Sequence, residues 1–263
     1  MVKQDANPLS ARMRNLAGAL ASVLFPAPCR ICGELLENAS RIPFCANCLA
    51  ALSAIAGPIC GKCGRPLVSP VLLEDSAEPR CGICRKGLYD FEFARSFAVY
   101  TPKVASAVLL LKYEELAPLG RLFAGRLVGL VQAHPEEFAA DLVVPVPLHP
   151  ARLRERGHNQ AELIAQPLAR QLGLPCRSYL LVRTRPRPDK LRLTLRERWR
   201  SVRGAYAIRE GRRVDKLRVL LVDDVMTTGA TLDACSRALR RAGASSVVAL
   251  TFARALPRGE VSP

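Results

Sequence analysis

Two adjacent acids, Asp223 and Asp224, stand between an apolar run and a turn rich in threonine and glycine. The whole segment, residues 219–231, reads VLLVDDVMTTGAT, which predicts a buried strand, two carboxylates, a turn and the start of a helix. In open α/β sheets the carboxyl ends of strands bind ligands, and the unpaired N–H groups of a helix N-terminus favour phosphate. Neighbouring carboxylates can accept hydrogen bonds from two sugar hydroxyls and stabilise positive charge at the anomeric carbon. The segment therefore predicts a ribose phosphate site.

Within this segment we expect the carboxylates to hold the ribose and the turn to hold its 5-phosphate. The turn residues, which offer hydroxyls and backbone N–H groups, are Thr227, Thr228, Gly229, Ala230 and Thr231. A plain strand-to-helix connection with an N-cap is the alternative, and it would account for an isolated Asp-Asp or Thr-Thr-Gly. It does not account for the complete string, so we favour the phosphate site.

Eight of the ten cysteines form four CxxC pairs, a spacing typical of zinc knuckles. The pairs are Cys29 and Cys32, Cys45 and Cys48, Cys60 and Cys63, and Cys81 and Cys84. The strings CRICGELL and CGKCGRPL share the form CxxCGxxL, which indicates two copies of one unit. We expect two structural Zn²⁺ ions with four thiolates each, the first bound by residues 29, 32, 45 and 48 and the second by residues 60, 63, 81 and 84.

Other uses of these cysteines are less favoured. An interleaved cross-brace is the alternative pairing, and disulfides, a redox CxxC or an iron–sulfur cluster are further readings. Gly33 and Gly64, which follow the first pair of each copy, can adopt the positive φ that turns backbone N–H groups toward the sulfurs. Cys176 and Cys235 lie outside the pattern and are expected to be core or surface thiols. Metal-binding cysteines indicate a reducing compartment, so we expect a cytoplasmic protein.

The charge of the chain is unevenly distributed. A chain of 263 residues with 49% hydrophobic content can bury a sizeable core, and its net charge of +16 favours polyanionic partners. Residues 183–218, the basic arm, hold 14 Lys and Arg against 4 acidic residues, which is +10 of that total. Trp199 and Tyr206 in the arm could stack on bases, so single-stranded DNA is an expected partner. A solvated charged hairpin is the alternative.

Strand-like and helix-like segments alternate after residue 90, which predicts a doubly wound α/β domain with a parallel sheet. Strands are expected at 95–100, 141–146, 180–183, 218–222 and 246–251, and helices at 103–112, 119–132, 159–172 and 231–242. The expected organisation is a leader helix at 1–28, a double zinc ribbon at 29–88, the α/β domain at 89–256 and a tail at 257–263.

Residues 1–28, the expected leader, allow two interpretations, a signal peptide or an amphipathic helix. Lys3, Arg12 and Arg14 precede the apolar run at 16–25, as the charged and apolar regions of a signal peptide would. No small-residue cleavage site follows, and the run is shorter than the roughly 20 residues that a membrane span needs. We therefore expect no membrane span, and an amphipathic helix that packs on the body or on a partner.

The complete string at 219–231 resembles the motif with which type I phosphoribosyltransferases bind phosphoribosyl pyrophosphate (PRPP). A second string, VPVPLHPARLRERGHNQ at 144–160, resembles proteins of the ComF family, and this resemblance covers nearly the whole chain, knuckles included. It implies a type I phosphoribosyltransferase fold that binds PRPP with Mg²⁺, and it makes Asp223 and Asp224 the catalytic acids.

The resemblance also assigns roles to two basic segments. By position, the loop after Val146 matches a pyrophosphate-binding loop, in which Arg152, Arg154 and Arg156 offer charge-assisted donors; a solvated helix face is the alternative. His158 and Asn159 start the next helix, where Asn159 can serve as a cap. The string RTRPRPDKLRLTLRERWRSVRGAY resembles the flexible loop that closes over substrate in this fold. It departs from ComF proteins, which carry Gln and Gly near Lys190 and Arg192, and Asn near Ser201.

Two functions follow from these features. The first is an enzyme that transfers the phosphoribosyl group to a nitrogen acceptor and acts in DNA uptake during natural transformation. Its acceptor is unassigned, because Thr227 stands where hypoxanthine-guanine transferases have an acid. The second is a non-catalytic single-stranded DNA-binding competence factor with PRPP as a regulatory ligand. Other competence or DNA-processing proteins are expected partners in either case.

Overall fold

The computed structural model describes residues 27–37, 40–67, 79–87, 89–114, 116–186 and 194–256. Most of the expected leader, the expected tail, and Lys190 and Arg192 of the basic arm lie outside these described residues. The chain forms two compact units, Met1–Leu52 and Ser53–Pro263. The boundary falls between the two cysteine units, so the second one belongs to the same unit as the α/β fold. The functional domain limits expected at 29, 89 and 257 remain predictions.

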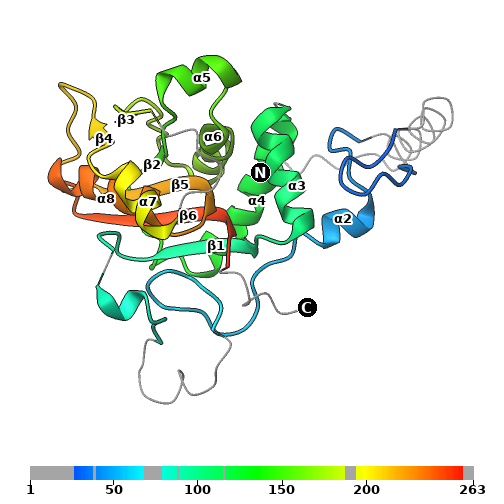
Figure 1. The fold of residues 1–263 in the computed structure, drawn as a ribbon, viewed down its shortest axis with the longest axis horizontal. Coiled ribbons are helices and arrows are strands. Elements are labelled where there is room, and N and C mark those ends of the chain that lie inside the picture. Colours follow the sequence, from blue (N-terminus) through cyan, green and yellow to red (C-terminus); the bar gives the residue numbers. More distant parts are fainter. Residues whose placement is uncertain are drawn as a thin grey trace, which may run out of the picture. The chain divides into compact units, whose positions relative to one another are not determined.

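A parallel sheet of four strands forms the centre of the larger unit (Figure 1). Its strands, in spatial order, are β1 (Ala94–Val99), β6 (Ser246–Arg254), β5 (Arg218–Met226) and β2 (Leu142–Pro145). The helices are α2 (Ala46–Ala50), α3 (Pro102–Tyr113), α4 (Ala117–Ala133), α5 (Pro150–Arg156), α6 (Gln160–Leu172), α7 (Leu195–Val202) and α8 (Ala230–Arg241), with a 3-10 turn η2 at Cys84–Lys86. A separate antiparallel pair joins β3 (Leu181–Arg183) to β4 (Tyr206–Ile208).

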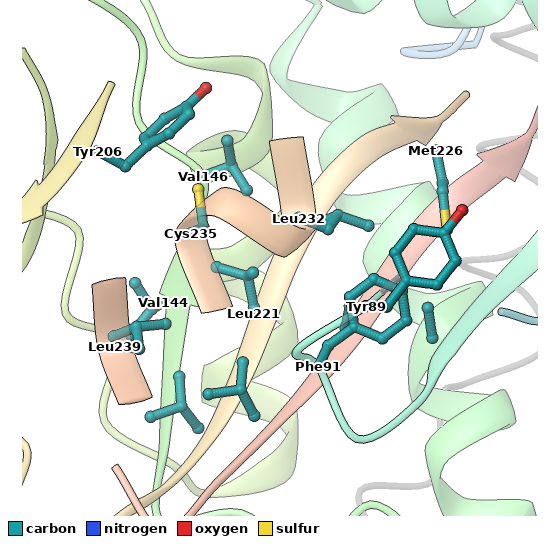
Figure 2. Close-up of a cluster of buried hydrophobic side chains, with 14 of the residues drawn as sticks. Tyr89, Phe91, Val144, Val146, Tyr206, Leu221, Met226, Leu232, Cys235 and Leu239 are labelled. Atoms are coloured by element: carbon teal, nitrogen blue, oxygen red, sulfur yellow. The ribbon is translucent and has the colours of Figure 1, made fainter. Parts of the chain in front are cut away.

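Side chains alternate between two buried faces of the sheet, as the continuous apolar run in β5 predicts. On one face, Leu221 packs in a cluster with Leu232 and Leu239 of α8 (Figure 2). On the other face, Phe252 of β6 stacks on Phe123 of α4, with ring centroids 3.5 Å apart. The expected α/β fold is therefore confirmed, with helices covering both faces of a parallel sheet.

Three differences from the expected elements concern the site. Strand β5 continues to Met226, so both acids lie within the strand and not after its end. Residues 150–156 form helix α5, where the family resemblance places a loop. The basic arm folds in part, since α7 and β4 occupy its described portion. Helix α7 begins with a capping box, in which Thr194 and Glu197 satisfy each other's backbone N–H groups.

The two cysteine units repeat one another in their backbone hydrogen bonds. Cys29 N–H donates to Glu34 O at 2.7 Å, and Cys60 N–H donates to Arg65 O at the same distance. The glycines after the knuckles have φ of +82° at Gly33 and +64° at Gly64, as expected for the turn back toward the sulfurs. The internal repeat in the sequence therefore corresponds to a structural repeat.

The second knuckle packs directly on strand β1. Ala94 N–H donates to Lys62 O at 2.8 Å, and Arg95 Nη1 donates to Gly61 O at 2.7 Å. A Cβ at Gly64 would lie 2.7 Å from Ala94 O, whereas a Cβ at Gly33 would meet nothing within 4 Å. The second unit is thus fixed to the edge of the sheet at a distance that only glycine allows.

No helix within the described ranges combines the length and the apolar character needed to cross a membrane.

Gly64→Ala is expected to destabilise the larger unit more than Gly33→Ala destabilises the smaller one. Both changes incur about 1–2 kcal/mol for a non-glycine residue in the left-handed region. Only Gly64→Ala adds a collision with the backbone of β1, which separates the knuckle from the strand. Urea unfolding, with zinc release followed by a chelating dye, measures both effects. Equal losses of stability in the two variants would contradict the packing described above.

Candidate functional site

A cavity of about 300 Å³ opens at the carboxyl end of β5. Six of the residues expected to bind PRPP line it: Asp223, Asp224, Thr227, Thr231, Arg152 and Arg156. Thr228, Gly229 and Ala230 belong to the same turn without lining the cavity, and Arg154 is exposed on α5 outside it. The structure therefore brings together residues from β5, α8 and α5 that are up to 79 positions apart in the sequence (Arg152 to Thr231).

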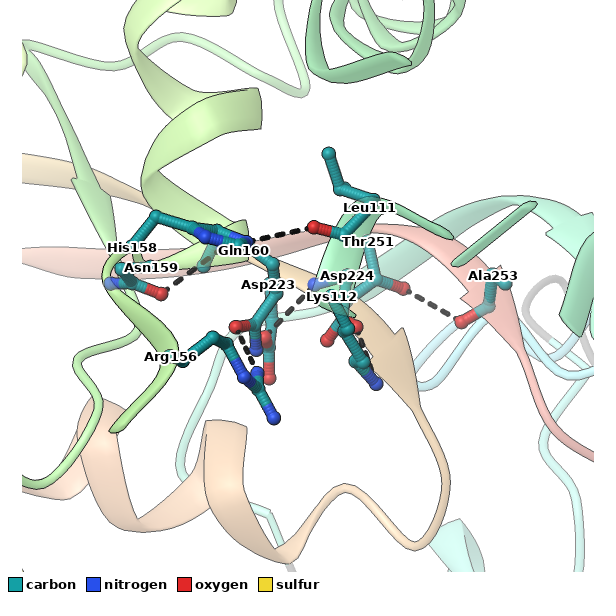
Figure 3. A network of polar contacts seen from close by, with 11 residues as sticks. Leu111, Lys112, Arg156, His158, Asn159, Gln160, Asp223, Asp224, Thr251 and Ala253 are labelled. Atoms are coloured by element: carbon teal, nitrogen blue, oxygen red, sulfur yellow. Dashed lines mark hydrogen bonds and ion pairs between the residues drawn. The ribbon is translucent and has the colours of Figure 1, made fainter. Parts of the chain in front are cut away.

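The two acids have different electrostatic environments (Figure 3). Asp223 is buried, and burial together with the neighbouring Asp224 charge raises its pKa well above the ordinary value. Burial would also raise the pKa of Asp224, but the Lys112 ammonium 2.6 Å from Asp224 Oδ2 outweighs it and lowers that pKa. Asp223 Oδ1 accepts a hydrogen bond from Asp224 N at 2.9 Å, which links the two groups. Lys112 thus favours the ionised form of Asp224, whereas burial and the neighbouring charge favour the protonated form of Asp223.

Lys112 is a site residue that sequence reasoning missed. It lies in the last turn of α3, 111 positions before Asp223, and its side chain is 22% exposed. Burial would lower the pKa of Lys112, but the Asp224 carboxylate raises it, so the ammonium stays charged. No local motif marks this lysine, because its partner is reached only through the sheet.

Arginines of α5, β3 and α7 place further positive charge around the two acids. Arg156 Nη1 donates to Gln160 Oε1 at 2.7 Å, and its guanidinium lies 5.0 Å from the centroid of the Tyr113 ring. Arg183 of β3 donates to the hydroxyl of Tyr206 at 2.7 Å. Arg198 of α7 donates to Thr227 Oγ1 at 3.2 Å. With Arg152 and Lys112, five cationic side chains face two carboxylates, which suits a polyanionic ligand.

The turn after β5 presents free backbone donors at the start of α8. Gly229 is the N-cap residue, with φ of +79°, and the Ala230 N–H donates to Thr228 Oγ1 at 3.3 Å. In this described turn, the N–H groups of Thr228, Gly229 and Thr231 donate to no protein acceptor. The helix dipole adds positive potential at the same place, so the turn can bind a phosphate group.

His158 and Asn159, which precede α6, support the cavity without lining it, whereas Gln160, the first residue of the helix, belongs to the lining. Asn159 caps the helix by accepting from Ala161 N at 3.2 Å and donates to Val146 O at 3.1 Å. His158 is buried, with Nε2 2.9 Å from Leu111 O (Figure 3). Since Leu111 precedes Lys112, this contact connects the loop after β2 to the end of α3.

The cysteine sulfurs gather in two groups of four, each group within 4.8 Å. The groups are Cys29, Cys32, Cys45 and Cys48, and Cys60, Cys63, Cys81 and Cys84, the sequential arrangement expected from the sequence. The Sγ atoms of Cys32 and Cys45 are 3.6 Å apart, and those of Cys63 and Cys81 are 3.7 Å apart. Zn–S bonds of about 2.3 Å in a tetrahedron place sulfurs about 3.8 Å apart, so both groups fit Zn²⁺.

Backbone donors support both groups in the same way. Cys45 N–H donates to Cys29 Sγ, and Cys81 N–H donates to Cys60 Sγ, each at 3.3 Å. Such N–H to sulfur bonds stabilise thiolate ligands. Four protein ligands leave no open coordination position, so each ion would be structural.

The other side of α7 borders a second hollow of about 590 Å³ against α8. Trp199, Arg200, Arg203, Arg237 and Arg241 line it. Trp199 is half-buried, with its ring centroid 5.8 Å from that of Tyr89, whereas Tyr206 is 7% exposed and held by Arg183. Of the two aromatic residues expected to stack on bases, only Trp199 keeps a partly exposed ring.

Comparison with known families matches two parts of the chain. Residues 20–86 match the double zinc ribbon domain, and residues 158–261 match the phosphoribosyl transferase domain. DNA utilization protein YhgH of Salmonella typhimurium is 31% identical over 241 residues, which cover 88% of this chain and 98% of that protein. Competence protein F of Haemophilus influenzae is 27% identical over 215 residues, 80% of this chain and 90% of that protein.

A second competence protein and two solved structures complete the comparison. Competence protein ComFC of Bacillus subtilis is 27% identical over 215 residues, covering 80% of this chain and 83% of that protein. Glutamine PRPP amidotransferase of B. subtilis, solved with ADP and GMP, is 25% identical and covers 50% of this chain and 26% of that one, with a TM-score of 0.33. A purine phosphoribosyltransferase from Pyrococcus horikoshii is 16% identical and covers 54% and 91%, with a TM-score of 0.33.

Lys112→Met is expected to destabilise the protein by about 3 kcal/mol at neutral pH, because it leaves the buried Asp224 carboxylate without its counter-charge. The lowered pKa of Asp224 contributes stability above the unfolded-state pKa, and this contribution disappears as pH falls through the folded-state pKa. The difference between Lys112→Met and the native chain should therefore shrink in acid. Urea unfolding from pH 3 to pH 8 measures it, with the double variant Lys112→Met/Asp224→Asn recovering part of the loss. A pH-independent difference would contradict the ion pair.

Proposed function

The chain belongs to the family of DNA utilization protein YhgH and the competence proteins F and ComFC, and we propose that its cavity at the end of β5 binds PRPP with Mg²⁺. The observation that carries this proposal is the meeting of two carboxylates and five cationic side chains in one cavity that Thr227 and Thr231, at the N-terminus of α8, also line. PRPP needs these three features together, because it combines ribose hydroxyls, a pyrophosphate and a 5-phosphate.

Each part of PRPP has a matching group in the cavity. The 5-phosphate binds the turn Thr227–Thr231, where the N–H groups of Thr228, Gly229 and Thr231 are available. The ribose hydroxyls donate to the carboxylates of Asp223 and Asp224, and Arg152 and Arg156 receive the pyrophosphate. Arg198 already contacts Thr227, so the basic arm reaches the phosphate side of the cavity.

Mg²⁺ prefers oxygen ligands, and Asp223 fits this requirement better than Asp224. Asp224 is paired with Lys112, whereas one oxygen of Asp223 accepts only from the neighbouring backbone N–H. Bound Mg²⁺ would neutralise part of the pyrophosphate charge and favour the ionised form of Asp223.

The reaction we propose transfers the phosphoribosyl group to a nitrogen acceptor. The bond between C1 and the pyrophosphate oxygen breaks with its electron pair on pyrophosphate, the new bond forms between C1 and the acceptor nitrogen, and the proton of that nitrogen passes to water. Asp224 keeps its negative charge through Lys112 and so stabilises positive charge on the ribose ring in the transition state. The arginines neutralise the departing pyrophosphate.

The first test is PRPP binding to the full-length chain in the presence of Mg²⁺, measured by titration calorimetry. Asp223→Asn/Asp224→Asn should abolish binding, because the ribose hydroxyls lose both carboxyl acceptors, while zinc content stays the same. Glu136→Gln, at an exposed position after α4 that does not line the cavity, is the control and should bind as the native chain does. Unchanged PRPP affinity in the double variant would reject the site. Pyrophosphate release with candidate nitrogen acceptors then separates turnover from binding alone.

A second candidate function is binding of single-stranded DNA, and the hollow between α7 and α8 favours it. Arg200, Arg203 and Arg241 are exposed around the partly exposed ring of Trp199. Arg237 forms ion pairs with Asp90 at 2.7 Å and with Asp233 at 3.0 Å, so we assign it a structural role in the lining of the hollow. Exposed arginines around an indole ring can bind the phosphates of a single strand while its bases stack on the ring. The names of the relatives, which refer to competence and to DNA utilization, point the same way.

Arg203→Gln/Arg241→Gln should weaken binding of a single-stranded oligonucleotide and flatten its salt dependence by about one unit of slope per lost phosphate contact. Asp223→Ala should leave this binding unchanged, because the acids lie in the other cavity. Fluorescence anisotropy between 50 and 300 mM salt measures both. A salt slope unaffected by the double arginine change would show that DNA, if bound, binds elsewhere on the chain.

A further inference from the structure

Two buried side chains connect the second cysteine unit to the turn after β5. Tyr89 follows that unit in the sequence, and its hydroxyl donates to Thr228 O at 2.7 Å. Arg254 ends β6, and its Nη1 donates to Met226 O at 3.2 Å and to Thr227 O at 2.7 Å. The Nη2 of Arg254 lies 3.8 Å from Cys63 Sγ. The turn that offers N–H groups to a phosphate is thus held through its carbonyls.

These contacts determine where the N–H groups of the turn point. In a planar trans peptide the carbonyl and the N–H point in opposite directions, and the described residues contain no cis peptide. Arg254 holds the carbonyl of Thr227 and Tyr89 holds that of Thr228, so the N–H groups of Thr228 and Gly229 point away from Arg254 and Tyr89. These are two of the three turn donors that have no protein acceptor.

The contact between Tyr89 and the turn is tight as well as polar. A Cβ at Gly229 would lie 2.8 Å from Tyr89 Cε1 and 2.7 Å from Met226 Cε. Tyr89 also stacks on Phe91, with centroids 4.7 Å apart, and Figure 2 shows both rings beside Met226. The ring is therefore fixed from two sides, and the turn has little freedom to rotate its peptides.

Arg254 is buried at 0% exposure, so it needs a counter-charge. Among the residues that the structure describes, no carboxylate forms an ion pair with it. The sulfur group of Cys60, Cys63, Cys81 and Cys84 is also buried, and its four thiolates would outweigh the charge of one Zn²⁺. With zinc bound, this negative centre would supply the counter-charge that the burial of Arg254 requires, since Arg254 Nη2 lies 3.8 Å from Cys63 Sγ.

We propose that the second zinc ribbon is part of the phosphate site, and that Tyr89 and Arg254 are positioning residues that orient the peptides of the turn toward the ligand. This inference rests on the proposed function for the identity of the ligand. The role is assigned to the second ribbon because Arg254 contacts its Cys63 sulfur and Tyr89, which follows it in the sequence, contacts the turn. Zinc in the second ribbon therefore supports phosphate binding, and zinc in the first does not.

The experiment compares matched cysteines of the two repeats in the full-length chain. Cys63→Ser and Cys32→Ser each remove the second cysteine of a repeat and should each lower zinc content from two to one per chain. Only Cys63→Ser should weaken binding of ribose 5-phosphate and PRPP, by at least tenfold, and increase hydrogen exchange of the Ala230 and Asp233 amides, which donate to Thr228 Oγ1 and Gly229 O. Equal effects of the two cysteine changes on affinity and on exchange would overturn the inference.

Tyr89→Phe provides a test that leaves the metal in place. It keeps the ring and removes one hydrogen bond, so zinc should stay at two per chain, exchange of the Ala230 and Asp233 amides should rise and ribose 5-phosphate affinity should fall about fivefold. Tyr179→Phe, at an exposed tyrosine, should change none of these quantities. Unchanged exchange of these two amides in both Tyr89→Phe and Cys63→Ser rejects the positioning role, whether or not the native chain binds PRPP. If the native chain does not bind PRPP but exchange changes as expected in the variants, PRPP is rejected as the ligand. The link between the second zinc ribbon and the turn after β5 is then retained.

Discussion

Charge compensation at the carboxyl end of β5 is the constraint on which the site depends. Asp223 and Asp224 are buried, and burial alone disfavours their ionised forms. Parallel strands direct their carboxyl ends to the same edge of a sheet, so the segments that follow β1, β2 and β5 meet there. This topology brings Lys112 to Asp224 and the arginines of α5 to the same cavity. The strand order therefore brings the acids and their counter-charges together.

A second feature of the fold is that one of the two cysteine units is part of the larger compact unit. The second cysteine unit is bound to β1 by backbone hydrogen bonds, and its sulfurs belong to the buried cluster that also contains Leu221 and Leu239. The first unit has the same internal hydrogen bonds, but it belongs to a separate compact unit. The repeated ribbon is thus attached to the sheet at its second copy, through contacts of Lys62 and Gly64 with β1.

Helix α7 faces two different environments with adjacent residues. Arg198 contacts Thr227 at the cavity of the acids, whereas Trp199 and Arg200 line the hollow beside α8. The helix is only eight residues long, and its capping box fixes its start at Thr194. A ligand in the cavity and a nucleic acid in the hollow would consequently share one short element of the basic arm, which connects the two proposed functions physically.

The sequence by itself determined the local features: four CxxC pairs in two repeats, the strand ending in two acids, the turn with its glycine, and the alternation of strands and helices. Each of these depends on neighbours in the chain, such as the φ of Gly33 and Gly64 or the apolar run of β5, and the expected strands and helices were confirmed within a few residues. Lys112, Tyr89 and Arg254 carried no signal, because a lone Lys, Arg or Tyr has meaning only beside its partner. Tertiary structure alone decided their roles, since the order of the parallel strands and the docking of one ribbon on β1 place charges far apart in sequence within hydrogen-bonding distance.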